Sequence, residues 1–215
     1  QRDVGGTAGA FFSIFDAIWL RPLPYPDADQ LVAVSEVELD DPSSSWSVAL
    51  ANYFDWKAQC DSFEHLTTVH MYWPLTLVGG DRPERITSRR VTEGYFEIFG
   101  GEASLGRLFL SEEFEVDGPP VIVLGHALWQ RLFGSDPGVL GRHVELERDV
   151  YTVVGVMSPD FETFYGDDID LWIPINWRMQ QRSARYFPVI GRLAEGTDIQ
   201  TAQAELDIVT RRLAE

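Results

Sequence analysis

The sequence contains a single cysteine, Cys60, among its 215 residues. One thiol excludes an internal disulfide and any CxxC zinc or redox motif. Basic residues are also scarce: 17 Lys and Arg stand against 34 Asp and Glu, which gives a net charge of −17. Such a surface repels phosphate groups, so the composition argues against binding to nucleic acid and to anionic membrane surfaces.

Motifs for catalysis, phosphate binding and metal binding are missing as well. The sequence has no HExxH, no G-x-S-x-G nucleophile elbow and neither of the glycine-rich phosphate loops. His65 and His70 are five positions apart, which does not place two imidazoles on one helical face. The acidic run Asp167, Asp168 and Asp170 lacks the spacing of a calcium loop. We therefore predict no catalytic residue, no cofactor and no metal, and interpret the chain as a non-enzyme.

A hydrophobic run long enough to span a bilayer is also absent. The stretch Thr7–Leu20 is largely apolar, but a membrane helix requires roughly 20 such residues. Its composition leaves three alternatives: a buried helix, an interfacial helix, or the end of a truncated membrane span. Arg21 and the prolines Pro22, Pro24 and Pro26 follow it. Because proline cannot continue a helix, these residues predict a stiff, extended exit segment.

The remaining sequence is typical of a folded soluble domain, with 45% hydrophobic and 24% charged residues. Short apolar runs alternate with helical patterns, which predicts an α+β fold. Ser47 is a candidate N-cap of the first helix, residues 40–45 are expected to form a loop, and residues 63–72 a helical turn followed by a strand. The expected strands are 31–37, 75–78, 84–91, 121–124, 144–146, 151–156, 171–175 and 187–193, and the expected helices are 47–59, 93–99 and 126–133.

The last segment has the clearest helical pattern. Asp198 is a suitable N-cap, and Ala202, Leu206, Val209 and Leu213 follow at spacings of 4, 3 and 4. These positions form one apolar stripe, so the pattern predicts a helix packed against a core.

Three other features receive structural interpretations. The dipeptides Gly106–Arg107 and Gly141–Arg142 occur in loop contexts, where each arginine could pair with a carboxylate and fix the loop. We interpret Cys60 as a small residue at a helix end, because no base is placed beside it by the sequence.

Several strings, in order and over nearly the whole chain, resemble the MacB-like periplasmic core domain of ABC transporter permeases, especially the duplicated permeases common in acidobacteria. One such string alone would be weak evidence of a resemblance, whereas this many strings in the same order are strong evidence. They are FSIFDAIWLRPLPYPDADQLV, NYFDWKAQCDSFEHL, RVTEGYFEIFG, SLGRLFLSEE, PPVIVLGHALWQRLFGSDPGVLGR, YTVVGVMSPDF and IGRLAEGTDIQTAQAELDIVTRRLA.

The resemblance implies a layout that we take as an expectation. Residues 1–26 would be the remnant of the first transmembrane helix and its proline-rich exit. Residues 27–100 and 179–215 would form a porter-like βαβ subdomain, and 101–178 a second α/β subdomain inserted in it. Residues 1–6 do not resemble the start of that helix, so we expect the span to be incomplete and the chain to be part of a longer membrane protein.

The resemblance also implies a function without chemistry in this domain. The domain would face the periplasm or cell exterior from the inner membrane. It would transmit conformational change from the permease's remaining transmembrane helices, while a separate cytoplasmic ATPase domain or subunit hydrolyses ATP. A homodimer or a paired permease is an expected assembly. We assign the membrane-proximal coupling to Arg21, Pro22, Pro24 and Pro26.

Two other functions stay open at this point. A ligand-sensing or substrate-capturing extracytoplasmic domain predicts a concave apolar pocket with a few polar groups. A secreted hydrolase predicts a nucleophile and a base within hydrogen-bond reach.

Overall fold

The structure is a computed structural model that describes residues 8–14, 25–38, 41–78, 83–163, 168–178, 182 and 185–214. The chain divides into two compact units. Unit 1 contains the described residues up to Thr68 and from Arg178, and unit 2 runs from Val69 to Trp177. The predicted α+β class, with one unit inserted in the sequence of the other, is confirmed.

The first boundary lies earlier than the expected position after residue 100. Strand β6 (Glu84–Val91) pairs in parallel with β11 (Leu171–Pro174), so both strands belong to one sheet. Because this pairing joins residues on either side of position 100, the compact unit begins before it, at Val69.

Unit 1 is built around a sheet in which neighbouring strands are antiparallel. Strand β13 lies between β2 and β5 and is antiparallel to both, so β2 and β5 run in the same direction. Helix α1 connects β2 to β5, which makes a split βαβ arrangement. In spatial order the sheet contains β1 (Ala8–Ile14), β2 (Leu31–Glu38), β13 (Val189–Leu193) and the first part of β5 (Phe63–Val78), while β3 (Asp41–Trp46) also pairs with β2.

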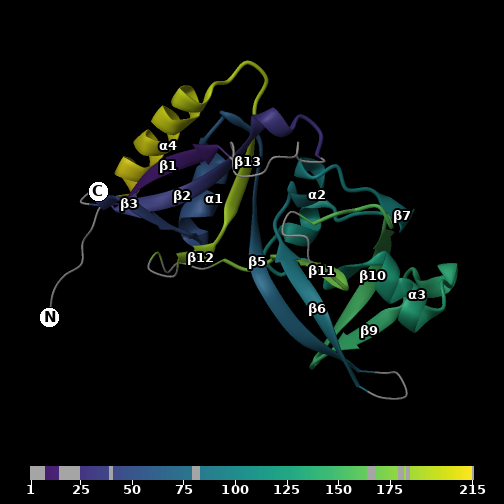
Figure 1. Ribbon diagram of the computed structural model, residues 1–215. Helices are drawn as coiled ribbons and strands as arrows, with labels where there is room; N and C mark the ends of the chain where they lie inside the picture. The colour runs from purple at the N-terminus through teal and green to yellow at the C-terminus, as the bar shows by residue number, and fades with distance from the viewer. Residues whose placement is uncertain are drawn as a thin grey trace, which may run out of the picture. The chain divides into compact units, whose positions relative to one another are not determined.

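Helices α1 (Leu50–Gln59) and α4 (Ile199–Ala214) lie side by side along this sheet (Figure 1). Ala202, Leu206 and Val209 are at most 2% exposed, as the apolar stripe predicted. The Asp198 carboxylate accepts a hydrogen bond from the Thr201 backbone N–H at 2.7 Å, which confirms the predicted N-cap.

The helical turn expected at the start of 63–72 is instead part of strand β5, and two predictions before α1 are also wrong. Ala8–Ile14 is not helical but forms β1, which pairs with β2 in register from Ala8↔Glu38 to Ile14↔Val32; residues 15–20 lie outside the described residues. The expected loop at 40–45 is instead strand β3 over Asp41–Trp46. In both cases pairing with β2 provides backbone partners that the local sequence does not reveal, and short apolar runs are ambiguous between helix and strand.

Unit 2 is a second, strongly curved sheet whose strands close on one another. Strand β9 pairs both with β10 and with the end of β5, while β7 pairs with the C-terminal part of β10. In spatial order the strands are the second part of β5, β6, β11, β8 (Val121–Leu124), β10 (Asp149–Met157) and β9 (His143–Leu146), with β7 (Ala103–Gly106) at the edge.

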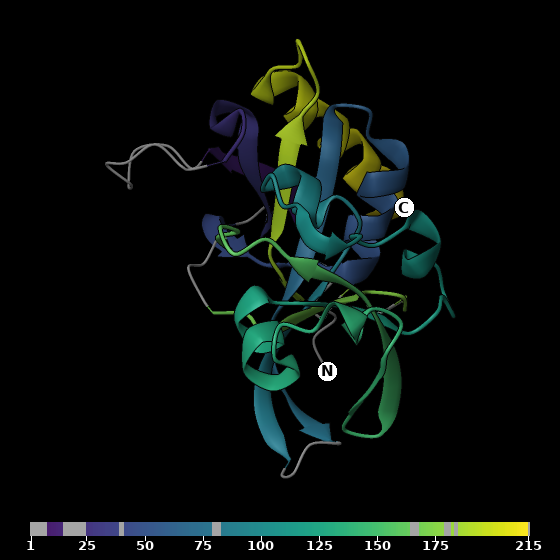
Figure 2. The same cartoon turned by 90° about the vertical axis from the view of Figure 1, so that its right-hand side faces the viewer.

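The helices of unit 2 match the expected ones. Helix α3 (His126–Phe133), in green-teal in Figure 2, ends at Gly134, which has φ +60°, and α2 (Tyr95–Ile98) falls within the predicted 93–99. Helix α3 buries Leu128 in an apolar core that also contains side chains from β5, β6, β8, β9, β10 and β11. The closed sheet therefore has its own core.

The two Gly–Arg dipeptides behave differently. Gly106 faces Gly155 across the β7–β10 pair, and a Cβ at Gly155 would lie 2.1 Å from the Arg107 carbonyl oxygen, so this approach needs glycine. Arg107 then donates two hydrogen bonds to the Glu113 carboxylate at 2.9 and 2.7 Å, as predicted. Arg142 instead lies over the Phe133 ring, with 5.5 Å from its Cζ to the ring centroid, and it has no carboxylate partner among the described residues.

Candidate functional site

The predicted coupling residues lie in the sequence between β1 and β2 of unit 1. Arg21, Pro22 and Pro24 are outside the described residues, so their role stays a prediction. Pro26 is exposed in a turn that leads to Asp27 and the short 3-10 helix η1 (Ala28–Gln30).

Asp27 is fixed to the central strand of unit 1. Its backbone is left-handed, with φ 43° and ψ 49°, a conformation that aspartate tolerates better than most residues. The Asp27 carbonyl accepts hydrogen bonds from the Gln30 N–H at 2.9 Å and from Arg192 Nη1 at 3.2 Å. Arg192 lies on β13 and is only 4% exposed. The end of the proline-rich segment is therefore held by a buried side chain of the sheet.

A buried carboxylate, Glu36, joins three separate parts of unit 1. It lies on β2 and is 1% exposed. Its Oε1 accepts hydrogen bonds from the Ala49 N–H at 3.0 Å and from Asn52 Nδ2 at 2.7 Å, and its Oε2 accepts from Arg185 Nε at 2.6 Å. The expected cap Ser47 does not start α1: Ala49 occupies the N-cap position, and the Glu36 carboxylate supplies the acceptor and negative charge favoured there.

Arginines of the segment that returns from unit 2 contact the side chains of α1. Arg182 donates to the Asn52 side-chain oxygen and forms an ion pair with Asp55 at 2.7 Å. The Arg178 guanidinium lies over the Phe54 ring, 3.9 Å from its centroid, in cation–π geometry. The Arg185 bond to Glu36 completes the attachment at β12 (Arg185–Phe187), which pairs with β4 (Val48–Ala49).

The other end of α1 is tied to α4. The Glu205 carboxylate accepts hydrogen bonds from the Asp61 N–H at 3.0 Å and the Ser62 N–H at 2.9 Å, and Trp56 Nε1 donates to Thr210 Oγ1 at 3.1 Å. Partial burial raises the pKa of Glu205, but the hydrogen bonds from Ser62 and Asp61 outweigh it and leave the pKa lowered. Helix α1 is thus held at both ends.

Cys60, beside this junction, is a buried free thiol. Burial raises its pKa, and the carboxylates of Glu205 and Asp61 raise it further, to about 12. A thiolate is the reactive form of cysteine, so Cys60 is suited to packing and not to nucleophilic chemistry, in line with its interpretation from the sequence.

Other chemistry finds little support in the part of the chain that the structure describes. No three His, Cys, Asp or Glu side chains gather there as metal ligands. Asp170, from the acidic run, accepts a hydrogen bond from the Thr87 N–H at 2.8 Å and pairs with Arg131 at 3.1 Å, so it joins β6, β11 and α3. Within the same described residues, no helix has the length and apolar character needed to cross a bilayer.

Comparison with known proteins identifies the family. The family model described as MacB-like periplasmic core domain matches residues 7–209. The chain belongs to this family. The MacB-like assignment agrees with curated relatives named macrolide export ATP-binding/permease protein MacB from Neisseria gonorrhoeae and Neisseria meningitidis, which are 33% identical over 115 residues. That match covers 50% of this chain but only 17% of the relatives' length.

Solved structures show the same MacB-like fold at low sequence identity. A permease-protein domain from Porphyromonas gingivalis has a TM-score of 0.66 at 16% identity, covering 87% of this chain and 86% of that chain. The periplasmic region of MacB from Actinobacillus actinomycetemcomitans has a TM-score of 0.61 at 16% identity, covering 86% and 83%. The expected family resemblance is therefore confirmed.

Sequence reasoning missed the charged residues that hold unit 1 together. Glu36 and Arg192 are single charges inside apolar strands, LVAVSEV and VIGRL. A charge in such a strand is costly to bury unless it is paired, which is the signal that could have marked both residues. Arg182 and Arg185 carry no comparable signal, because they lie in a polar run.

Proposed function

We propose that this chain is the extracytoplasmic domain of an ABC transporter permease and that it transmits conformational change from the membrane without chemistry of its own. ATP would be hydrolysed by a separate cytoplasmic domain or subunit, and the domain would face the periplasm from the inner membrane. The permease's remaining transmembrane helices are its expected partners. The expected assembly is a homodimer or a paired permease. The Neisseria relatives are named export proteins, which supports a role in export.

The observation that carries this proposal is the anchoring of unit 1 at Asp27, where the proline-rich segment ends, and at the segment that returns from unit 2. Asp27 is held by the hydrogen bond from Arg192 to its carbonyl at 3.2 Å. The returning segment is held by Arg185 and Arg182 on Glu36 and Asp55. A displacement of the proline-rich segment would therefore be passed to the central strand of the sheet and not absorbed by a flexible loop.

The proposal also requires a stiff segment before Asp27. Prolines stiffen an extended segment, whereas glycines make a linker flexible. The spacing of Pro22, Pro24 and Pro26 is therefore suited to carrying motion to Asp27.

The test uses the full permease assembled with its ATPase. Hydrogen exchange over β2 and α1 is measured with and without ATP, because amide protection reports local opening without knowledge of the cargo. We expect an ATP-dependent difference in the unaltered protein. Replacing Pro22, Pro24 and Pro26 with glycine is expected to reduce that difference and to reduce transport.

A matched control separates coupling from a general effect of removing proline. Pro26→Gly and Pro83→Gly both replace an exposed proline, but Pro83 precedes β6 and belongs to unit 2. Pro83→Gly should leave the ATP-dependent exchange difference intact. If the triple glycine variant keeps the full exchange difference and full transport, the coupling proposal is wrong.

A further inference from the structure

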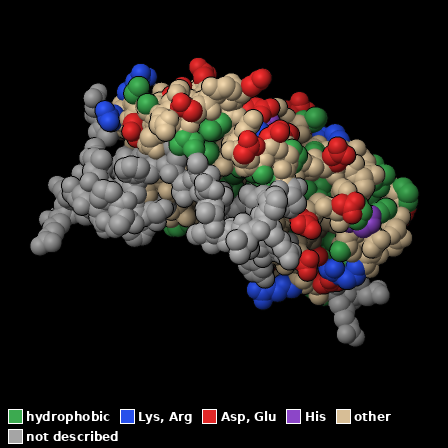
Figure 3. Space-filling view, turned by 45° about the horizontal axis from the view of Figure 1, so that its top comes forward, with side chains coloured by type: hydrophobic (Ala, Val, Ile, Leu, Met, Phe, Trp, Pro, Cys, Tyr) green, Lys and Arg blue, Asp and Glu red, His purple; other side chains and the backbone are tan. Residues whose placement is uncertain are grey.

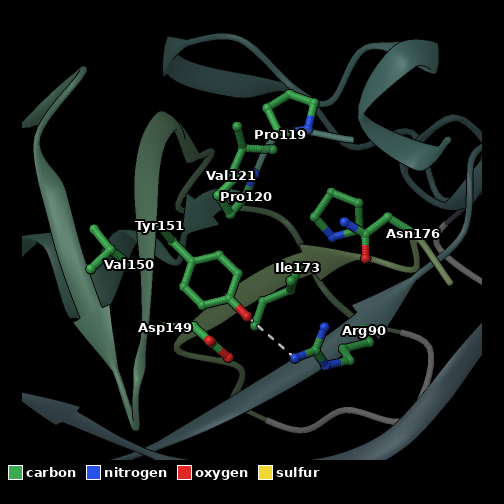
Figure 4. A pocket seen from close by; sticks show the side chains of 10 residues that line it. Arg90, Pro119, Pro120, Val121, Asp149, Val150, Tyr151, Ile173 and Asn176 are labelled. Carbon is green, nitrogen blue, oxygen red and sulfur yellow. Dashed lines mark hydrogen bonds between the residues drawn. The ribbon is translucent and has the colours of Figure 1, made fainter. Parts of the chain in front are cut away.

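Unit 2 contains a pocket of about 180 Å³ that the transmission role does not use. It opens between β10 and β11 on the side where β8 begins (Figure 4). At about 30 Å³ per water molecule in the liquid, this volume equals on the order of six waters. The residues that matter for its chemistry are Arg90, Pro120, Asp149, Tyr151, Ile173 and Asn176.

The pocket exists because two prolines precede β8. The parallel pairing of β8 with β10 starts at Val121↔Thr152, so Asp149 to Tyr151 of β10 extend beyond it. The antiparallel pairing of β8 with β11 covers only Leu171 and Trp172. Pro119 and Pro120 have no backbone N–H to continue either ladder. The strands on either side of β8 therefore separate here, and their side chains line a cavity.

Arg90 brings a cation to this cavity. Its Nη2 lies 3.4 Å from the Tyr151 hydroxyl, a long hydrogen bond, and its Cζ lies 5.1 Å from the centroid of the Trp177 ring. In Figure 4 the guanidinium and the Tyr151 hydroxyl point toward one another. No ion pair joins Arg90 to an acidic side chain among the residues that the structure describes. Most of its five N–H donors thus stay available to a ligand.

Among the described residues this arginine has no carboxylate partner, although acids outnumber bases by two to one in the chain. In contrast, Arg107 and Arg131 of the same unit each form an ion pair with a carboxylate. Acidic side chains are scattered over the described part of the face in Figure 3. A guanidinium that lies over the Trp177 ring and has no carboxylate partner is suited to bind a carboxylate of a ligand, in the planar two-bond geometry that arginine favours.

The walls and rim restrict which anion fits. Val121, Ile173 and Pro120 make apolar walls, while Tyr151 is only 8% exposed. Asp149 adds a negative charge at the rim, and the chain as a whole carries −17. Such a field disfavours dianions such as phosphate. A monoanion with a compact apolar group meets all of these conditions.

We propose that the Arg90 pocket binds the α-carboxylate of a small apolar amino acid, with the carboxylate on Arg90 and the side chain against Val121, Ile173 and Pro120. The ligand is either a free amino acid, whose ammonium group would donate a hydrogen bond to the Asp149 carboxylate, or the C-terminal residue of a peptide chain. This binding site does not depend on the proposed transmission role and adds a ligand to unit 2.

The test is a titration of the 215-residue chain with four probes. Binding is monitored by the nuclear magnetic resonance signals of the arginine Nε–Hε groups. The probes are L-valine, N-acetyl-L-valine, L-valinamide and inorganic phosphate. We expect saturable shifts of the Arg90 signal with at least one of the two carboxylates. Equal binding of L-valine and N-acetyl-L-valine assigns the source to a chain end, and a preference for L-valine assigns it to a free amino acid.

Two variants test the role of Arg90, and one serves as control. Arg90→Met should weaken carboxylate binding at least tenfold, and Arg90→Lys, which keeps the charge but loses the planar fork, should weaken it less. Arg85→Met removes an exposed arginine of the same strand and should leave binding unchanged. Thermal unfolding establishes that each variant is folded, and if Arg90→Met is not, Arg90→Lys carries the comparison.

Three results would overturn the proposal. The first is the absence of saturable binding by both carboxylates. The second is binding of L-valinamide or phosphate as tight as that of the carboxylates. The third is carboxylate binding that is unaffected by the substitution at Arg90.

Discussion

Each unit buries a glutamate against an arginine, but the two glutamates connect very different parts of the chain. In unit 1, Glu36 contacts residues 13, 16 and 149 positions away. In unit 2, Glu113 contacts Arg107 and the Leu110 N–H, six and three positions away. Both carboxylates are nearly inaccessible, at 1% and 2% exposure.

The difference shows what each carboxylate can stabilise. Glu113 shapes one loop, and losing it would release that loop alone. Glu36 joins β2, the start of α1 and the strand that returns from unit 2, so its contacts can make unit 1 respond as one body. This property is the one that the proposed transmission of motion needs.

The largest expected effect is that of Glu36→Ala. It leaves the Ala49 N–H and the Asn52 amide without their acceptor and Arg185 without its charge partner. Breaking a buried ion pair by removing one side typically costs about 3–5 kcal/mol. We expect a loss of that order in the free energy of unfolding, measured by urea denaturation of the 215-residue chain. A loss under about 1 kcal/mol would contradict the assigned role.

Glu113→Ala is expected to have a smaller effect. The Arg107 side chain is 42% exposed, so water can solvate the guanidinium when the carboxylate is removed. A lost hydrogen-bonding partner of this kind costs about 1–3 kcal/mol. The same urea denaturation should give this smaller loss. If Glu113→Ala destabilises the chain more than Glu36→Ala, the proposed contrast is reversed.

Glu205→Gln should show a still smaller, pH-dependent effect. Because the pKa of Glu205 is lowered in the folded chain, its stabilisation is present above the ordinary glutamate pKa and is lost as pH falls through the folded value. Glu205 is only partly buried, so solvent screening reduces the effect and we expect about 1 kcal/mol or less at neutral pH. Thermal unfolding between neutral and strongly acidic pH should show the two proteins converging as pH falls. A constant difference at all pH values would show that the charge is not responsible.

The smallest expected effect concerns Cys60. With a pKa raised to about 12, the thiol stays protonated at pH 8, whereas an unperturbed cysteine has a pKa of about 8.5. Labelling by a thiol reagent at pH 8 should be negligible in the folded chain and complete in urea. Rapid labelling of the folded chain would mean that the junction of α1 and β5 opens readily.

Much of the regular structure was predictable because its signals are local. The apolar runs at 31–37 and 121–124 mark strands β2 and β8, the run at 187–193 contains β13 as well as the end of β12, and the stripe after Asp198 marks α4. The wrong predictions lie where a distant partner decides the outcome. Residues 8–14 and 41–46 become strands through β2, and α1 begins at Leu50 because Glu36, far away in sequence, provides the acceptor at its N-terminus.

The candidate sites were predictable to different degrees. The RPLPYP exit was visible in the sequence, and its described end leads into the anchored residue Asp27. The anchoring residues Glu36 and Arg192 required the three-dimensional pairing of strands to gain meaning. The Arg90 pocket was hidden, because β6, β8, β10 and β11 assemble it from segments up to 86 positions apart, from Arg90 to Asn176.

Hydrogen exchange of Glu36→Gln and Glu113→Gln in the 215-residue chain is the most direct test of the contrast. If Glu36 joins distant segments into one body, Glu36→Gln raises exchange together in β2, in the first turn of α1 and in β12. Glu113→Gln should raise it only between residues 107 and 118. Increased exchange confined to the neighbours of Glu36 on β2 would contradict the account.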